Sequence, residues 1–228
     1  MGSWPLGIMA ALPLLATGSA YPGPLDFNCT SPPLSVVYGA PLGAIHCGTK
    51  VLKTNAGLAQ APTVTFPAAR AGAGYTLMMI DAGGSAGPQE VYPVRHWLVV
   101  NIPGAELRRG NITGGLVGEK FHSPGPPSGS HYHRYAQFVF EQPSPIVDFS
   151  KGDDMNMTIP FHTPVRVLIY SEGVLAAPLK ALTHARTCGG GGGQIISWNY
   201  SIFIDQFKLG QKLASNYILC EAPGGLTV

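Results

Sequence analysis

Tyr75-Thr-Leu-Met-Met-Ile-Asp81 and Arg95-His-Trp-Leu-Val-Val-Asn101 are two dense apolar runs in the middle of the sequence. Short continuous apolar runs are typical of strands that are buried on both faces. The stretch between them, Ala82–Pro93, is rich in Gly, Pro and Ser and predicts a loop. The two runs therefore predict the centre of a sheet, with Asp81 at the end of one strand and His96 at the start of the next.

The rest of the chain also favours strands over helices. Gly (30 residues) and Pro (21 residues) interrupt short apolar runs, and few stretches have a helical period. The helix prediction is Ile202–Leu213, where Phe203 and Phe207 lie four residues apart on one face. We expect a mostly β protein. The predicted strands are Leu34–Tyr38, Thr63–Phe66, Tyr75–Ile80, His96–Asn101, Tyr135–Glu141 and Val165–Tyr170.

Length and charge limit the classes of partner. A chain of 228 residues with 45% hydrophobic residues is long enough for one well-buried domain. Charged residues make up only 11%, about half the usual share. The net charge is +2, and no run of Lys or Arg is longer than Arg108-Arg109. These features argue against a nucleic-acid partner, and no motif calls for a cofactor.

The N-terminus has the pattern of a secretory signal peptide. Pro5–Leu15 is almost wholly apolar, and Gly18-Ser19-Ala20 offers a cleavage site before Tyr21. We expect residues 1–20 to be the signal peptide and 21–228 a single domain; a buried N-terminal segment is the alternative. The apolar run is shorter than the roughly 18–20 residues that a spanning helix needs, so no transmembrane segment is expected.

Two further features agree with secretion. The even number of cysteines, without a Cys-x-x-Cys motif, favours two structural disulfides with three possible connectivities over a zinc site, and four free buried thiols are the alternative. The cysteines are Cys29, Cys47, Cys188 and Cys220. The Asn-x-Ser/Thr sequons, predicted glycosylation sites, begin at Asn28, Asn111, Asn156 and Asn199.

Asp81, His96 and His133 form the first candidate site. Strand ends place side chains at the rim of a sheet, where loops can close over them. A carboxylate near two imidazoles orients them and is expected to raise their pKa. Such a cluster suits a phosphate or carboxylate ligand, with Gly125 and Gly129 leaving backbone N–H groups open to approach. Satisfied polar groups without a ligand are the alternative.

Two other patterns compete with this site. Gly83-Gly84-Ser85-Ala86-Gly87 matches the Gly-x-Ser-x-Gly nucleophile elbow of serine hydrolases and follows a predicted strand. An elbow also needs a helix directly afterwards, and Pro88 and Pro93 argue against one. In an extended segment His131 and His133 would face the same way and could bind one metal, with His96 or His122 as a third ligand.

Four blocks of the sequence resemble the phosphatidylethanolamine-binding protein family. They are Tyr75–Asp81, Arg95–Gly104, Gly125–Tyr135 and Phe138–Gln142, and their order and spacing agree with the family. Weaker similarity covers Leu34–Phe66, Phe203–Gly210 and Ala214–Tyr217.

The resemblance implies an antiparallel β-sandwich of one large and one small sheet with few short helices. It also implies a pocket at one edge for phosphate, acetate or a phospholipid headgroup. The residues that match the pocket motif are Asp81, His96, Gly125, Pro126, His133 and Tyr135.

The sequence also departs from the family pattern. Asp81 is followed by Ala-Gly-Gly-Ser85 in place of the usual Pro-Asp-x-Pro, and Val94 stands where an aromatic pocket wall is common. The stretch of about 146–197 resembles an insertion. These departures leave the choice of headgroup open.

The sequence thus predicts a secreted, non-catalytic binding protein for a phosphate-containing small molecule or phospholipid headgroup. A protease inhibitor that acts through the pocket rim and the inserted loop is the alternative, with a protease as partner. A serine hydrolase or a metal-binding protein is the third possibility.

Overall fold

The computed structural model describes residues 27–84, 94–151, 198 and 200–223. The predicted signal peptide, the predicted strand Val165–Tyr170 and most of the proposed insertion lie outside these residues. Cys188 and the sequons at Asn156 and Asn199 also lie outside them.

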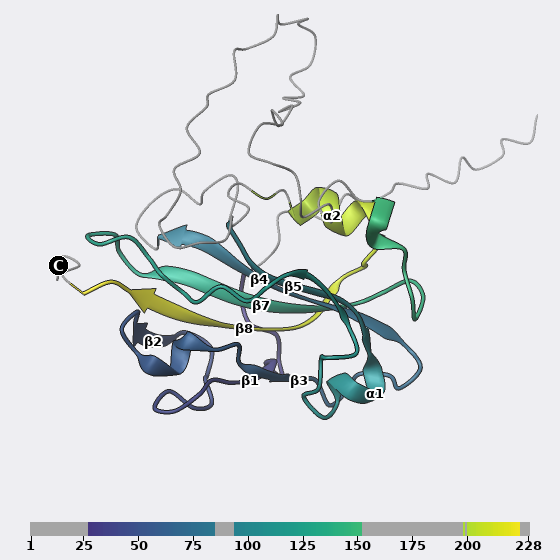
Figure 1. Ribbon diagram of the computed structural model, residues 1–228, viewed down its shortest axis with the longest axis horizontal. Coiled ribbons are helices and arrows are strands. Elements are labelled where there is room, and N and C mark those ends of the chain that lie inside the picture. Colours follow the sequence, from purple (N-terminus) through teal and green to yellow (C-terminus); the bar gives the residue numbers. More distant parts are fainter. Residues whose placement is uncertain (1–26, 85–93, 152–197, 199, 224–228) are drawn as a thin grey trace, which may run out of the picture.

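The described chain forms two sheets with short helices around them (Figure 1). The six-stranded sheet has the order β2-β8-β7-β4-β5-β6, and β1 pairs with β3 in a separate two-stranded sheet. The strands are β1 (Ser35–Val37), β2 (Thr49–Leu52), β3 (Thr63–Thr65), β4 (Gly74–Gly84), β5 (Val94–Pro103), β6 (Leu116–Glu119), β7 (His133–Glu141) and β8 (Lys212–Glu221). The helices are η1 (Ala56–Ala59), α1 (Gly104–Leu107), η2 (Phe149–Lys151) and α2 (Tyr200–Gln206).

Strand β4 is the centre of the large sheet, with β5 and β7 as antiparallel neighbours. Met78 and Met79 follow one another in the strand and point to opposite faces, yet both are fully buried. This burial on both faces explains the continuous apolar run Tyr75–Ile80. The predicted strands that fall within the described residues are confirmed.

The two faces of the large sheet are covered by different layers. On one face, Leu77, Met79 and Val139 belong to a core that includes Val36 of β1 and Val64 of β3. On the other face, Met78 and Phe138 pack in a core with Trp198 and with Phe203 of α2. Figure 1 shows α2 and the small sheet on opposite sides of the large sheet.

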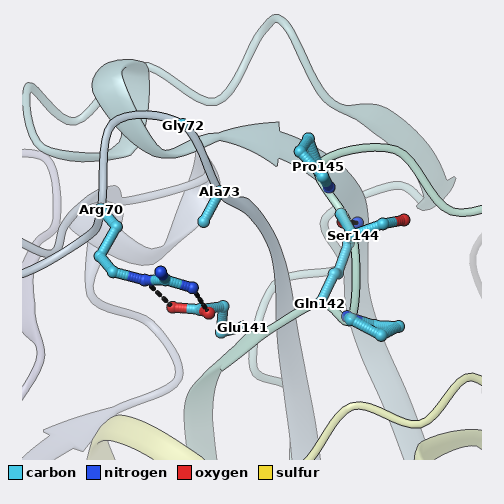
Figure 2. A pocket seen from close by; sticks show the side chains of 8 residues that line it. Arg70, Gly72, Ala73, Glu141, Gln142, Ser144 and Pro145 are labelled. Carbon is cyan, nitrogen blue, oxygen red and sulfur yellow. Dashed lines mark hydrogen bonds and ion pairs between the residues drawn. The ribbon is translucent and has the colours of Figure 1, made fainter.

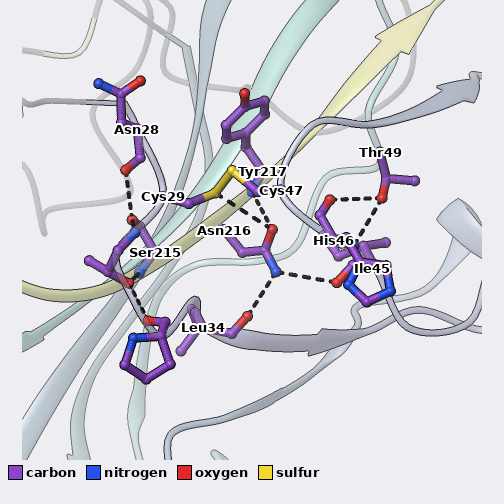
Figure 3. Close-up of a disulfide and its surroundings, with 12 residues drawn as sticks. Asn28, Cys29, Leu34, Ile45, His46, Cys47, Thr49, Ser215, Asn216 and Tyr217 are labelled. Atoms are coloured by element: carbon purple, nitrogen blue, oxygen red, sulfur yellow. Dashed lines mark hydrogen bonds between the residues drawn. A yellow bond between two sulfur atoms is a disulfide. The ribbon is translucent and has the colours of Figure 1, made fainter.

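The N-terminal segment is attached to β8 through Asn216 and Ser215 (Figure 3). The buried Asn216 side chain donates from Nδ2 to the carbonyl oxygens of Leu34 (2.8 Å) and Ile45 (3.4 Å). Backbone N–H groups make the same attachment, because Leu34 N donates to the Ser215 oxygen at 3.0 Å. The Cys29–Cys47 disulfide lies beside these contacts and closes this segment upon itself.

The large sheet is mixed rather than purely antiparallel, which corrects the antiparallel prediction. Strand β2 pairs with β8 in parallel, with Thr49 opposite Ile218 and Leu52 opposite Glu221. Parallel pairing requires a long connection between the two strands, and here almost the whole domain lies between them in sequence.

The predicted helix Ile202–Leu213 is wrong in its C-terminal half. Helix α2 ends at Gln206, and the backbone then has positive φ at Lys208 (54°) and Gly210 (49°). These left-handed residues end the helical path, and the chain enters β8 at Lys212. The Phe203–Phe207 contact that suggested the helix does form, with ring centroids 4.9 Å apart.

The prediction that all four cysteines form disulfides is corrected at Cys220. Cys29 and Cys47 are paired, but Cys220 is a free thiol with no exposed surface. Cys220 points from β8 into the core beneath the small sheet.

Asn216 provides a test of the attachment of the N-terminal segment. Asn216→Ala removes the donor to two backbone carbonyls in a buried setting, so we expect the free energy of unfolding to fall by about 2 kcal/mol. Denaturant unfolding with the disulfide intact measures this change. Gln60→Ala is the control, because Gln60 is exposed and should change stability by less than about 0.5 kcal/mol. If both substitutions lower the free energy of unfolding equally, the Asn216 hydrogen bonds do not hold the N-terminal segment to β8.

Candidate functional site

The candidate site begins at a bulge near the end of β4. The pairing of β4 with β7 shifts between Asp81, opposite Tyr135, and Gly84, opposite His133. Gly83 has a φ of 80°, and its backbone N–H donates to Asp81 Oδ1 at 2.8 Å. A bulge of this kind redirects the neighbouring side chain. The Ala-Gly-Gly sequence after Asp81 therefore has a local structural role, because glycine takes a positive φ without strain.

Asp81 and His133 form a close pair across these two strands. His133 Nδ1 lies 2.9 Å from Asp81 Oδ2 and 3.2 Å from Oδ1. Because a carboxylate only accepts hydrogen bonds, Nδ1 carries the hydrogen and the protonation of Nε2 decides the charge of the ring. The two side chains are only 12% and 10% exposed, which places the pair at the rim of the core.

His96 and Tyr135 complete the cluster. The Tyr135 ring meets His96 edge-on with 5.0 Å between centroids and stacks on His133 at 6.4 Å. His96 Nδ1 donates to the His122 carbonyl oxygen at 3.0 Å, and His122 N donates back to the His96 oxygen at 2.8 Å. The Nδ1 bond fixes the His96 ring and its tautomer, and the backbone bond holds the two residues side by side.

The loop before β7 joins the cluster through two contacts. Gly125 N donates to the Tyr135 hydroxyl at 3.3 Å. Lys53, directly after β2, donates from Nζ to the Pro126 carbonyl oxygen at 3.2 Å. The structure thus brings together all six residues of the predicted pocket, and it adds Lys53, which sequence analysis missed. No sequence spacing links Lys53 to this loop, because the contact depends on the parallel β2–β8 pairing.

Burial sets the electrostatics of the cluster. Desolvation lowers the pKa of His96 below its usual value, and this effect outweighs the opposing bond to the His122 carbonyl and the Asp81 charge. The prediction that the pKa of both imidazoles lies above the usual value is therefore wrong for His96, although the Asp81 charge acts in the predicted direction. Burial, followed by the Asp81 charge, raises the pKa of Tyr135, so its hydroxyl stays protonated. Around neutral pH the site thus holds a neutral imidazole at His96.

A buried ionic cluster supports His96 from behind. Glu119 at the end of β6 lies 3.0 Å from His122 Nε2 and 3.5 Å from the guanidinium of the fully buried Arg95. The Arg95 guanidinium also lies over the Trp198 ring, 4.9 Å from its centroid. The backbone carbonyl of His122 accepts the hydrogen of His96 Nδ1. By holding the His122 side chain, this cluster positions the His96 ring without contacting the site itself.

Cys220 lies beside the cluster on β8, opposite His133 in the strand register. Burial and the nearby Asp81 charge raise the pKa of its thiol to about 12. The Lys53 charge acts in the opposite direction on the same thiol. The positive charge of Lys53 therefore acts on the buried Cys220 thiol as well as on the loop at the rim of the site. The even cysteine count favoured a disulfide for Cys220, because cysteine spacing does not show that this thiol is buried.

The two competing motifs have different outcomes. Ser85 and the rest of its Gly-x-Ser-x-Gly motif after Gly84 lie outside the described residues, so the elbow stays a prediction. For the metal alternative, the described ranges contain no group of three His, Cys, Asp or Glu side chains that could hold an ion. His133 and His122 are instead bonded to Asp81 and Glu119.

A separate cavity of about 390 Å³ lies at the opposite end of β4 and β7 (Figure 2). Its walls include Arg70 and Glu141, which form a bidentate ion pair, together with Gln142 and Pro145. The Arg70 hydrogen bond lowers the pKa of Glu141, and the two charges cancel. None of the predicted site residues lines this cavity, so the cavity and the titratable cluster are distinct features of the fold.

The fold and the cluster define a class of mostly β protein in which a histidine–carboxylate site lies at the rim of a six-stranded sheet. The family model described as phosphatidylethanolamine-binding protein matches residues 35–181, well over half of the chain. The chain belongs to the phosphatidylethanolamine-binding protein family.

Individual relatives agree with this assignment. A 26 kDa secreted antigen of Toxocara canis is 35% identical over 108 residues, which are 45% of this chain and 36% of the antigen. This chain thus matches about a third of that relative's length. Two solved structures share the fold. A carboxypeptidase Y inhibitor in complex with its cognate proteinase has a TM-score of 0.52, 15% identity and coverage of 83% and 82% of the two chains. The Plasmodium vivax phosphatidylethanolamine-binding protein has a TM-score of 0.51, 16% identity and coverage of 83% and 84%.

The lowered pKa of His96 can be measured directly. In an NMR titration the His96 ring should titrate below the reference pKa of about 6.5. His96 then binds a proton more readily in the unfolded chain than in the folded chain. Its full contribution to the stability of the fold is therefore present only above about pH 6.5, the pKa in the unfolded chain. This contribution is lost as the pH falls from about 6.5 through the folded pKa. A midpoint at or above 6.5 would show that Asp81 dominates over burial.

Proposed function

We propose that this protein is a secreted, non-catalytic binding protein whose site takes a phosphate-containing headgroup. The observation that carries the proposal is the cluster of His96, His133 and Tyr135 around Asp81, closed by the Gly125–Pro126 loop. Family membership supports a phospholipid-type ligand. The secreted relative supports secretion. None of the helices in the described part of the chain is long and apolar enough to cross a membrane.

The charges of the site give the binding a pH dependence. Asp81 brings a negative charge to the site, and the buried His96 is neutral near pH 7. An anion in this site favours the charged form of His96, so binding is coupled to the uptake of a proton. Lys53 adds a positive charge at the rim of the site, beside the Pro126 carbonyl oxygen.

The first test measures the affinity for glycerophosphorylethanolamine, a phosphodiester whose charge is constant in this range, by calorimetry between about pH 7.5 and pH 5.5, where the reference His titrates. Affinity should rise as the pH falls, by at most about tenfold per pH unit for one coupled proton. His96→Asn should flatten this dependence, because the titrating group is gone. His133→Ala should weaken binding roughly ten- to a hundredfold, since a charge-assisted hydrogen bond contributes about 1.5–3 kcal/mol.

Two controls separate these effects from general damage. His46→Ala removes an exposed imidazole away from the cluster and should leave affinity unchanged. Lys53→Met should lower affinity at every pH, whereas Lys208→Met removes an exposed charge near α2 and should not. If His133→Ala binds like the unsubstituted protein, the cluster is structural and the proposed ligand is wrong.

Protease inhibition through the pocket rim and the 146–197 segment is the second candidate. It is favoured by the shared fold with an inhibitor that is solved in complex with its proteinase. An assay against carboxypeptidase Y and a panel of secreted proteases tests it. Inhibition that survives His133→Ala would assign a protein partner outside the anion site.

The absence of catalysis is a further prediction, with Ser85 as its critical residue. An organophosphorus probe for serine hydrolases should not label the folded protein, because Pro88 and Pro93 argue against the helix that an elbow needs to activate its serine. Labelled protein is detected by intact mass. Labelling that disappears in Ser85→Ala would make this protein an enzyme.

A further inference from the structure

The free edge of β6 is an exposed apolar surface. Strand β6 is the last strand of the large sheet, and within the described residues only β5 pairs with it. Leu116 and Val117 lie on this strand and are 54% and 50% exposed. Open strand edges with apolar side chains pair readily with other chains, so proteins usually cover or charge them. Here the edge residues carry neither a charge nor a proline until Glu119, which is buried.

An exposed sequon lies just before this edge. Asn111 and Thr113 are exposed in the loop that joins α1 to β6. Thr113 donates to Asn111 Oδ1 from both its backbone N (3.0 Å) and its hydroxyl (2.8 Å). The Asn111 amide donates to Glu106 Oε2 at 2.7 Å, a contact that is also exposed. A turn closed by the Gly115 N–H bond to the Ile112 oxygen (3.0 Å) then leads directly into β6.

The other described sequon is built differently. The Thr30 hydroxyl donates to the Pro32 oxygen and accepts from Ser215 N, so it belongs to the attachment of the N-terminal segment. The Asn28 carbonyl accepts from Lys212 Nζ and from Ser215 Oγ. This sequon lies against β8, which is an interior strand, and it is not near an open edge.

We propose that Asn111 carries an N-linked glycan and that this glycan covers the free edge of β6. A glycan is bulky and well hydrated, and on Asn111 it displaces no buried contact. It shields Leu116 and Val117 from the strands of other molecules. The inference rests on the secretion that the proposed function includes.

The first experiment measures occupancy. The full chain is expressed in secreting eukaryotic cells, and its mass is compared before and after enzymatic removal of N-glycans. Asn111→Gln and Thr113→Ala should each remove one glycan, while Thr113→Ser should keep it. A glycan at Asn28 but none at Asn111 overturns this inference and leaves secretion intact. The absence of any glycan on secreted protein also overturns it, while failure of the chain to be secreted contradicts the proposed function as well.

The second experiment measures what the glycan does. Asn111→Gln should self-associate several-fold more strongly than the unsubstituted protein in analytical ultracentrifugation, and Asn28→Gln should not. Adding Leu116→Lys and Val117→Lys to Asn111→Gln should restore the monomer, because charges on an edge strand prevent pairing. Both positions are half-exposed, so the substitutions should preserve the fold, which far-UV circular dichroism checks. An unchanged association state in Asn111→Gln would show that the edge needs no cover.

Discussion

The structure depends on the burial of β4 on both of its faces. A strand with Met78 and Met79 buried back to back cannot lie at the surface of a sheet, so it needs an apolar layer on either side. The small sheet forms one layer and α2 with Trp198 forms the other. The small sheet comes shortly before β4 in the sequence, whereas α2 and Trp198 come near the end of the described chain. The order of the large sheet, with β4 between β5 and β7, follows from the same requirement.

The site is a product of this rigid centre. Strand β4 is paired on both sides as far as Asp81, and its pairing with β7 becomes irregular only after that residue. The carboxylate therefore has a fixed position, and His133 and His96 are presented to it by the two neighbouring strands. Lys53 directly follows β2, which lies at the far end of the sheet order. Its side chain donates to the Pro126 carbonyl oxygen at the rim of the site. A rigid sheet thus supplies the titratable groups, while a glycine-rich turn and a proline-rich loop shape their surroundings.

The sequence predicted the parts of this protein that are determined locally. Continuous apolar runs identified β4, β5 and β7, and a family resemblance brought Asp81 and His133 together. The short strands β2 and β6 were missed, because four residues with a mixed pattern carry little periodic signal. The parallel pairing of β2 and the lowered pKa of His96 are set by tertiary contacts, which no spacing reveals. Cys220 was misassigned for the same reason, since its burial decides its chemistry.

The position of β8 has a consequence for how the chain reaches this fold. The last described strand inserts between β2 and β7, so the sheet stays incomplete until residues 212–221 have been synthesised. The N-terminal segment finds its hydrogen-bond partners at Ser215 and Asn216 only then. Such pairings between remote parts of a sequence give a high contact order and slow folding. During translation the strands that emerge earlier therefore have an open edge, and unpaired strand edges of this kind make folding intermediates prone to aggregation.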